Sequence, residues 1–355
     1  MSHEKFGKIG FVLGGGGCAE GLPQAIQLRV FYEHGITPDY IMAVSVGAYN
    51  AITYQHAVSI WQKYIKSPDA IYKINPELKK IFENKIKLLP RSPFHKHESW
   101  KDLLTDFYNQ GKNVTQFIQQ VLAFGSRTLK SLPYIQVGVE PRPQHFSPMI
   151  KPFFSYLEES GLDKITSLLD LEPLISIIKD HLDFKRVVDN GIVLQILARS
   201  LESSEECVFT PQNEKELLEA TQASSALRPF FPPVKINGKL YCDGGHMNPL
   251  PVHYAFENNC DTVFAFVKNH NEYSSSLHLL ESLLEETNVA QRALFIKLEK
   301  EAEERANREN KKLHIIVPAK LHPDLQLLWI TPEALEYTVR IETEATEKFL
   351  EKILI

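Results

Sequence analysis

A serine in the N-terminal part of the chain, Ser45, stands where a hydroxyl could act as a nucleophile. It follows the apolar run Tyr40–Val44, a helix-like segment begins after it, and Gly47 comes two residues later. A serine at a tight strand-to-helix turn exposes its hydroxyl, as in the nucleophile elbow, whose usual pattern is G-x-S-x-G. Here Ala43 replaces the first glycine. A serine that caps a helix would give the same local sequence, so this motif alone leaves both interpretations open.

Four consecutive glycines, Gly14–Gly17, follow the apolar segment Lys8–Leu13. Unshielded amides at the start of a helix can converge on one anionic oxygen, either of a phosphate or of a reacting ester. The dinucleotide-binding pattern G-x-G-x-x-G fails, because the nearest match, ending at Gly21, is one residue too long. The pattern G-x-x-x-x-G-K-[ST] of nucleotide-binding loops is absent. An oxyanion hole and a plain glycine-rich turn remain as interpretations.

The third candidate is Asp243, which follows the apolar segment Lys239–Cys242 and precedes Gly244 and Gly245. Alone, an Asp-Gly-Gly sequence is more often a turn than a catalytic site. Its place after a strand gives it weight, because the glycine loop and Ser45 also follow strands.

The elements that must position these groups indicate an α/β fold with a mostly parallel sheet. A helix is expected to end before Gly35, another to cover Ala48–Ile65, and Asn237-Gly238 has the sequence of a hairpin turn. Core strands are expected at Lys8–Leu13, Tyr40–Val44, Gly191–Arg199, Thr262–Val267 and Leu313–Val317, and long helices at Leu277–Asn310 and Pro332–Leu354.

Composition excludes several classes of protein. The formal net charge is -5, so no basic field over the whole chain would attract nucleic acid. The four cysteines form no C-x-x-C pair, which argues against a disulfide framework and fits a reducing compartment. We expect a cytoplasmic protein without a signal peptide or transmembrane segment, and delivery to another cell stays open.

In their order and flanks, the three motifs resemble those of the patatin-like phospholipases. The family pattern is a GGG-type loop, then G-x-S-x-G, then D-G-[GA], and the resemblance covers roughly residues 7–66 and 165–268. It implies a three-layer α/β/α fold with a mostly parallel central sheet and a helical insertion. The implied domains are a catalytic core of 1–66 and 165–270, an insertion or cap of 67–164, and C-terminal helices and a strand, 271–355, packing on the core.

The resemblance also implies a mechanism. Ser45 and Asp243 would form a catalytic dyad, and the amides of Gly15, Gly16 and Gly17 an oxyanion hole. Gly47, Gly244 and Gly245 would support these motifs, with no metal and no other cofactor. The implied activity is that of a serine ester hydrolase of the phospholipase A or lysophospholipase type. Its partners would be a phospholipid or other acyl-ester lipid and a transient membrane surface, with no nucleic acid; a protein activator stays open.

Two departures from the family pattern matter. The family usually has Arg or Lys just after the glycines, whereas this chain has Cys18-Ala19-Glu20 before Gly21. The second departure is Ala43. Both motivate the alternative of a patatin-fold interaction protein with weak or lost catalysis.

Outside these motifs the sequence leaves alternatives open. The 67–164 segment has aromatic and basic residues that suit a lid or membrane-facing surface, or equally a helical cap with its own core. His246, near Asp243, is more simply a packing residue than a catalytic one. His95 and His97 have no third ligand at a defined spacing, so a metal site there is not favoured. The charged segment 299–312 reads as a solvated helix face.

Overall fold

The computed structural model describes residues 2–78, 80, 164–182, 191–268, 279–325, 327–328 and 330–354. The chain divides into two compact units, one of residues Met1–Lys73 and Asp170–Ile355 and the other of Ile74–Leu169. Most of the 67–164 segment, including His95 and His97, lies outside the described residues. The domain boundaries expected from the sequence therefore stay predictions.

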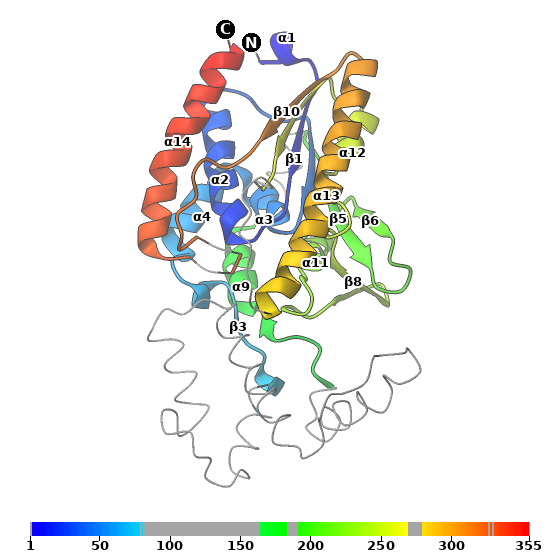
Figure 1. The fold of residues 1–355 in the computed structure, drawn as a ribbon, viewed down its shortest axis with the longest axis vertical. Helices are drawn as coiled ribbons and strands as arrows, with labels where there is room; N and C mark the ends of the chain where they lie inside the picture. Colours follow the sequence, from blue (N-terminus) through cyan, green and yellow to red (C-terminus); the bar gives the residue numbers. More distant parts are fainter. Residues whose placement is uncertain are drawn as a thin grey trace. The chain divides into compact units, whose positions relative to one another are not determined.

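The first unit is built on an eight-stranded sheet with the order β10-β9-β1-β2-β5-β8-β7, and β6 pairs with β5 beside this path (Figure 1). Five neighbouring strands are parallel, and the other three pair antiparallel. The parallel strands are β10 (Lys312–Ile316), β9 (Thr262–Phe266), β1 (Ile9–Leu13), β2 (Tyr40–Val44) and β5 (Val193–Ser200). The others are β6 (Glu206–Phe209), β7 (Val234–Ile236) and β8 (Lys239–Asp243). This arrangement confirms the expected α/β class with a mostly parallel sheet.

Helices cover both faces of this sheet. Figure 1 shows α2 and α14 on one side and α12 and α13 on the other. Every residue of β1, β2 and β9 is buried, as expected for parallel strands covered on both faces. The helices of this unit are α1 (Ser2–Phe6), α2 (Cys18–Glu33), α3 (Val46–Thr53), η1 (Tyr54–His56), α4 (Ala57–Tyr64), η2 (Pro68–Ala70), α9 (Glu172–His181), α11 (Glu214–Ser224), α12 (Val252–Glu257), α13 (Leu279–Arg308) and α14 (Pro332–Leu354).

The core has a different composition on each face of the sheet. On one face, Phe11 of β1 packs edge-on against Phe31 of α2 and Phe266 of β9, with ring centroids 5.7 and 5.1 Å apart. The next residue of β1, Val12, belongs to a cluster with more aliphatic members, such as Met42 and Val263, which also includes Phe256 of α12. This alternation follows from the two-residue period of a strand and fixes which helices each face binds.

The register of β5 brings Ser45 and Asp243 to one place. Val44, the residue before Ser45, pairs with Leu197 of β5. Asp243 pairs with Ala198, the next residue along the same strand. Two residues far apart in the sequence are thus placed by consecutive residues of one central strand.

One helix ends where the sequence predicts, and another differs from expectation. Helix α2 begins at Cys18, directly after the glycines, and ends before Gly35, whose φ of +70° is the conformation expected of a glycine after a helix. The expected helix Ala48–Ile65 is instead α3, η1 and α4 in succession. Thr53, which ends α3, bonds its hydroxyl to the Tyr49 carbonyl at 2.7 Å, a local bond that competes with regular helix.

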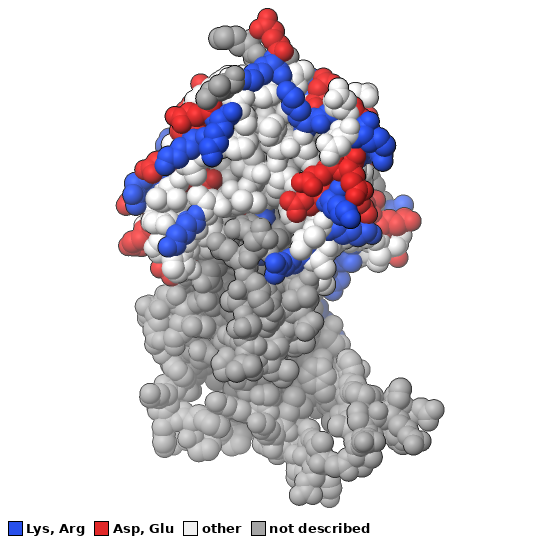
Figure 2. All heavy atoms as spheres, turned by 45° about the horizontal axis from the view of Figure 1, so that its top comes forward, with Lys and Arg blue, Asp and Glu red and all other residues white. Residues whose placement is uncertain are grey.

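A second, smaller sheet and a surface of mixed charge complete the described part of the chain. Strands β3 (Lys73–Ile74) and β4 (Leu169–Asp170) form a separate two-stranded sheet. On the face seen in Figure 2, basic and acidic side chains are interspersed over the described residues. Within the described ranges, no helix combines the length and the apolar character needed to cross a bilayer.

Candidate active site

Ser45 occupies a strained turn between β2 and α3. Its φ and ψ are +57° and -128°, outside the ordinary regions for a residue with a side chain. Although it is the residue before the helix, its side chain makes no capping hydrogen bond. The helix-capping interpretation of the sequence therefore does not describe this serine. Such strain costs about 1–3 kcal/mol and persists only where the surroundings hold it.

Glycines allow the turn to be this tight. A Cβ on Gly47 would lie 2.3 Å from the carbonyl oxygen of Leu13, which is closer than atoms can approach. A Cβ on Gly15 would lie 2.8 Å from Cβ of Ser45 and 3.4 Å from its Oγ. The glycine loop after β1 therefore lies directly against the Ser45 side chain, and only glycine fits at either position.

Asp243 ends β8 with its carboxylate almost fully buried, the residue being 5% exposed. The backbone N–H of Gly245 donates to its Oδ1 at 2.8 Å. The Ser45 side chain also acts on this carboxylate and lowers its pKa. The structure thus brings together the serine and the aspartate that the sequence analysis singled out.

The environment of Asp243 raises its pKa above the ordinary value of an aspartate. Burial is the largest cause, because it disfavours the charged form. The Ser45 side chain and the Gly245 amide oppose this effect, as do the nearby His246 and Arg199. An aspartate with a raised pKa is a stronger base than one in water.

The backbone N–H groups of the glycine loop differ in whether they donate a hydrogen bond. The N–H of Gly14 donates to the Phe266 carbonyl at 2.8 Å, and that of Cys18 donates to the Leu327 carbonyl at 2.9 Å. Between them, the N–H groups of Gly15, Gly16 and Gly17 donate to no other described residue. The loop is therefore anchored at both ends, and Gly15, the first of these three residues, lies against the Ser45 side chain.

A buried polar chain, which sequence reasoning missed, fixes this loop to the helix after Ser45. Gln24 of α2 donates from Nε2 to the carbonyls of Gly14 and Phe266, at 3.3 and 3.2 Å. Asn50 of α3 donates to Oε1 of Gln24 at 2.9 Å and accepts from Nε1 of Trp61 at 3.1 Å. The side-chain amides of Gln24 and Asn50, which stand among apolar residues in the sequence, were a signal for these hydrogen bonds, because buried polar groups need partners.

Glu20 stands where the family usually has a basic residue, and it points inward. It is fully buried, and neither carboxylate oxygen has a hydrogen-bond partner of good geometry among the described residues. Burial raises its pKa well above the ordinary value, and the Glu342 carboxylate raises it further. Lys268, directly after β9, opposes this shift, and its own pKa is lowered by burial. In the sequence, Lys268 could have been found as a basic residue that directly follows the apolar strand segment Thr262–Val267.

His246 does not join Ser45 and Asp243 in a compact triad. It is exposed, and its ring contacts the Gln291 side chain of α13. Its influence on Asp243 is that of a nearby charge. Among the described residues, no group of three or more His, Cys, Asp or Glu side chains could hold a metal ion.

Comparison with known proteins shows the family of this chain. The family model described as patatin-like phospholipase matches residues 11–256, more than half of the chain. The chain therefore belongs to the patatin-like phospholipase family, whose members are lipid acyl hydrolases. Among curated protein sequences, none matches significantly.

Two solved structures match this chain at low identity and low TM-score. VipD from Legionella pneumophila is 12% identical with a TM-score of 0.38, and the match covers 97% of this chain and 67% of VipD. The complex of SpcU with full-length ExoU, from the type III secretion system of Pseudomonas aeruginosa, is 14% identical with a TM-score of 0.33. That match covers 99% of this chain and 53% of the other, so this chain spans about half of its length.

Proposed function

We propose that this protein is a phospholipase A-type lipid acyl hydrolase that works through a Ser45–Asp243 dyad. The observation that carries the proposal is the placement of Ser45 beside the buried carboxylate of Asp243 and against the glycine loop, where the serine side chain lowers the pKa of that carboxylate. A nucleophile, a base and preorganised donors are the three parts that ester hydrolysis requires.

In the first half-reaction, Oγ of Ser45 bonds to the carbonyl carbon of a fatty-acyl ester, and its proton passes to Asp243. The carbonyl oxygen becomes an oxyanion, which the amides of Gly15, Gly16 and Gly17 stabilise. Each such donor is worth about 2.7–4 kcal/mol of barrier. The ester bond then breaks, and the leaving alcohol takes the proton from Asp243.

In the second half-reaction, water attacks the acyl-serine, and Asp243 takes its proton. The acyl–oxygen bond to Ser45 breaks, the serine recovers a proton from Asp243, and a fatty acid leaves. The raised pKa of Asp243 supports both half-reactions, because the group must accept a proton and return it in each. Neither half-reaction needs a metal or other cofactor.

The proposed substrate is a phospholipid or another acyl-ester lipid, reached at a transient membrane surface. Family membership supports the lipid class. The proposed setting is a cytoplasmic protein that associates with membranes peripherally, and a protein activator is an open part of the proposal.

A second candidate function, an interaction protein with weak or lost catalysis, is favoured by one observation. Glu20 places a buried carboxyl at the start of α2, beside the glycine loop. If ionised, it would oppose the developing oxyanion rather than stabilise it. Its raised pKa favours the neutral form and limits this opposition.

Fatty-acid release from vesicles of mixed phospholipids tests the two candidates. Wild type and Ser45→Ala are compared with and without a host-cell extract, which supplies any activator. Covalent labelling by a fluorophosphonate, which replaces fluoride by Oγ of a reactive serine, is measured in parallel. Release and labelling that disappear in Ser45→Ala support the hydrolase. A folded wild-type protein that neither labels nor releases fatty acid in any condition supports the interaction protein.

A further inference from the structure

Three consecutive residues at the end of α11 contact the backbone of both candidate catalytic residues. The Ser45 N–H donates to Oγ of Ser224 at 2.8 Å. Oγ of Ser225 donates to the Ser45 carbonyl at 3.0 Å. The Asp243 N–H donates to the Ala226 carbonyl at 3.2 Å. One short segment therefore holds both backbone groups of the serine and the amide of the aspartate.

The same segment is fixed to the central strand. Oγ of Ser224 donates to the Leu197 carbonyl at 2.6 Å, while accepting from Ser45. Leu197 is the residue of β5 that pairs with Val44, and its neighbour Ala198 pairs with Asp243. Ser224 is fully buried and Ser225 is 7% exposed, so water does not compete freely for these bonds.

The hydroxyls of Ser224 and Ser225 bond to other parts of the chain, whereas that of the nearby Thr221 bonds within its own helix. Thr221, also fully buried in α11, bonds its Oγ1 back to the Leu217 carbonyl one turn earlier at 2.7 Å. That bond is the usual local use of a hydroxyl within a helix. Ser224 and Ser225 instead direct their hydroxyls to Ser45 and β5, outside α11.

We propose that Ser224, Ser225 and Ala226 form a positioning bridge that sets the separation and orientation of Ser45 and Asp243. The bridge holds the turn at Ser45 in its positive-φ conformation by bonding the N–H and the carbonyl of the same residue. It fixes Asp243 through the Ala226 carbonyl, so that movement of the segment would move both groups. This inference rests on the proposed hydrolase function, because it assigns roles to residues that serve its dyad.

The bridge predicts effects on rate more than on substrate binding. A displacement of about 1 Å at reacting groups costs on the order of 10²-fold in rate. Loss of the bond from Ser225 should loosen the turn at Ser45 and weaken the contact of its side chain with Asp243. Because that contact lowers the pKa of Asp243, the acid limb of the pH–rate profile should move to higher pH. Gly245, His246 and Arg199, which also act on Asp243, are unchanged in this variant, whereas the buried phenol of Tyr49, which senses the Asp243 charge, loses its interaction with the Ser225 hydroxyl.

The test compares Ser225→Ala with Ser225→Thr, which keeps the hydroxyl, and with Thr221→Val as a matched control from the same helix. The rate of fluorophosphonate labelling and the hydrolysis of p-nitrophenyl butyrate are measured from pH 4 to 9, together with Tm. Ser225→Ala should label and turn over about 10- to 100-fold more slowly, with KM within about twofold and the acid limb shifted upward. Ser225→Thr should recover most of the rate, and Thr221→Val should keep the wild-type rate.

The outcomes separate the bridge from the proposed function. Wild-type protein that does not label at Ser45 overturns the proposed function and the bridge with it. Wild-type labelling with an unchanged rate and pH profile in Ser225→Ala overturns the bridge alone. A loss that Thr221→Val shares, or that Ser225→Thr does not rescue, also overturns it. If Ser225→Ala does not fold, Ser225→Cys, which keeps the size and weakens the donor, carries the same predictions.

Discussion

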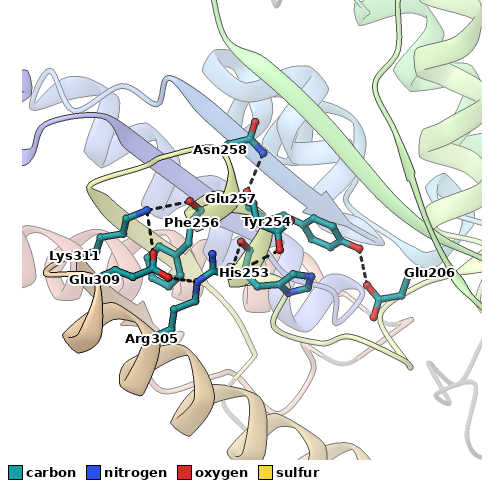
Figure 3. A network of polar contacts seen from close by, with 9 residues as sticks. All are labelled: Glu206, His253, Tyr254, Phe256, Glu257, Asn258, Arg305, Glu309 and Lys311. Carbon is teal, nitrogen blue, oxygen red and sulfur yellow. Dashed lines mark hydrogen bonds and ion pairs between the residues drawn. The ribbon is translucent and has the colours of Figure 1, made fainter.

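Two polar networks of this molecule lie in different surroundings. The network around Ser45 is buried between helices and strands, and it holds a strained residue against a carboxylate with a raised pKa. The second network lies around α12 and is partly exposed, with the side chains of Arg305, Glu309 and Lys311 at 26%, 30% and 15% exposure (Figure 3). Lys311 donates to the Phe256 carbonyl at 3.0 Å, and Arg305 pairs with Glu309 at 2.7 Å.

The second network stabilises one end of α12. Arg305 and Lys311 bring positive charge to the carboxyl end of α12, where the carbonyls of His253 and Phe256 accept their hydrogen bonds. Both cations also lie over the Phe256 ring, at 5.6 and 5.3 Å from its centroid. Water and salt screen such contacts, so their net contribution is small. The difference teaches that burial, rather than the number of polar contacts, decides where chemistry is possible.

The largest expected effect comes from the base of the buried network. Asp243→Asn should lower fatty-acid release by at least about 10³-fold, because the amide cannot accept the serine proton. In wild type, activity should rise with pH along an acid limb that lies above the ordinary aspartate pKa of about 3.9, since burial raises the pKa and the base must be ionised. Asp324→Asn, at an exposed position, serves as the control. A limb that persists in Asp243→Asn would show that another group is the base.

A smaller effect is expected from the turn itself. Gly47→Ala should reduce activity on the order of 10²-fold and stability by about 1–3 kcal/mol, because the new methyl group would overlap the Leu13 carbonyl. Gly35→Ala is a matched control, since its φ of +70° strains an alanine in open space. It should lose about 1–2 kcal/mol of stability and no activity. Denaturant unfolding and the esterase assay measure both quantities, and equal activity losses would contradict the role given to the turn.

Glu20→Gln should change stability in a pH-dependent way. Because the pKa of Glu20 is raised in the folded state, its contribution to stability is favourable at low pH and is lost as pH rises above the ordinary glutamate value of about 4.3 toward the raised pKa. The variant should therefore match wild type near pH 4 and exceed its Tm near pH 8, by about 2–4 °C for each kcal/mol. A Tm difference that stays constant between these pH values would argue against a buried, protonated Glu20.

The smallest effect is expected in the partly exposed network around α12. Arg305→Met should change stability by at most about 1 kcal/mol and leave hydrolysis unchanged, because it removes partly screened ion pairs to Glu257 and Glu309 and no contact with Ser45 or Asp243. The variant is assayed beside Asp243→Asn by unfolding and by fatty-acid release. A loss of activity in Arg305→Met would break the distinction between the two networks.

Much of the fold was predictable because its signals are local. Tyr40–Val44 is a strand and Pro332–Leu354 a helix with the bounds expected from the sequence. The three motifs could be found because each couples a strand end to glycines. The catalytic roles of Ser45, Asp243 and the glycine amides remain proposals.

The supporting contacts could not be predicted, because they depend on strand register and on helices that meet only in the folded chain. Nothing in the sequence around Ser224 shows that its hydroxyl reaches both Ser45 and Leu197. The hydrogen bonds that link Trp61, Asn50 and Gln24 likewise join three helices, and no local pattern in the sequence shows how these helices pack. Glu20 was visible as a departure, but its burial and its proximity to Lys268 were not.

The contact between the Cys18 amide and the Leu327 carbonyl has a consequence for dissecting this chain. Leu327 lies well beyond the segment that the family model matches, as do β9, which pairs with β1, and α14, which packs on α2. A fragment trimmed to residues 11–256 would leave β1 as an open sheet edge and remove one anchor of the glycine loop. The smallest piece of this protein that can retain a formed site must therefore extend through its final helix.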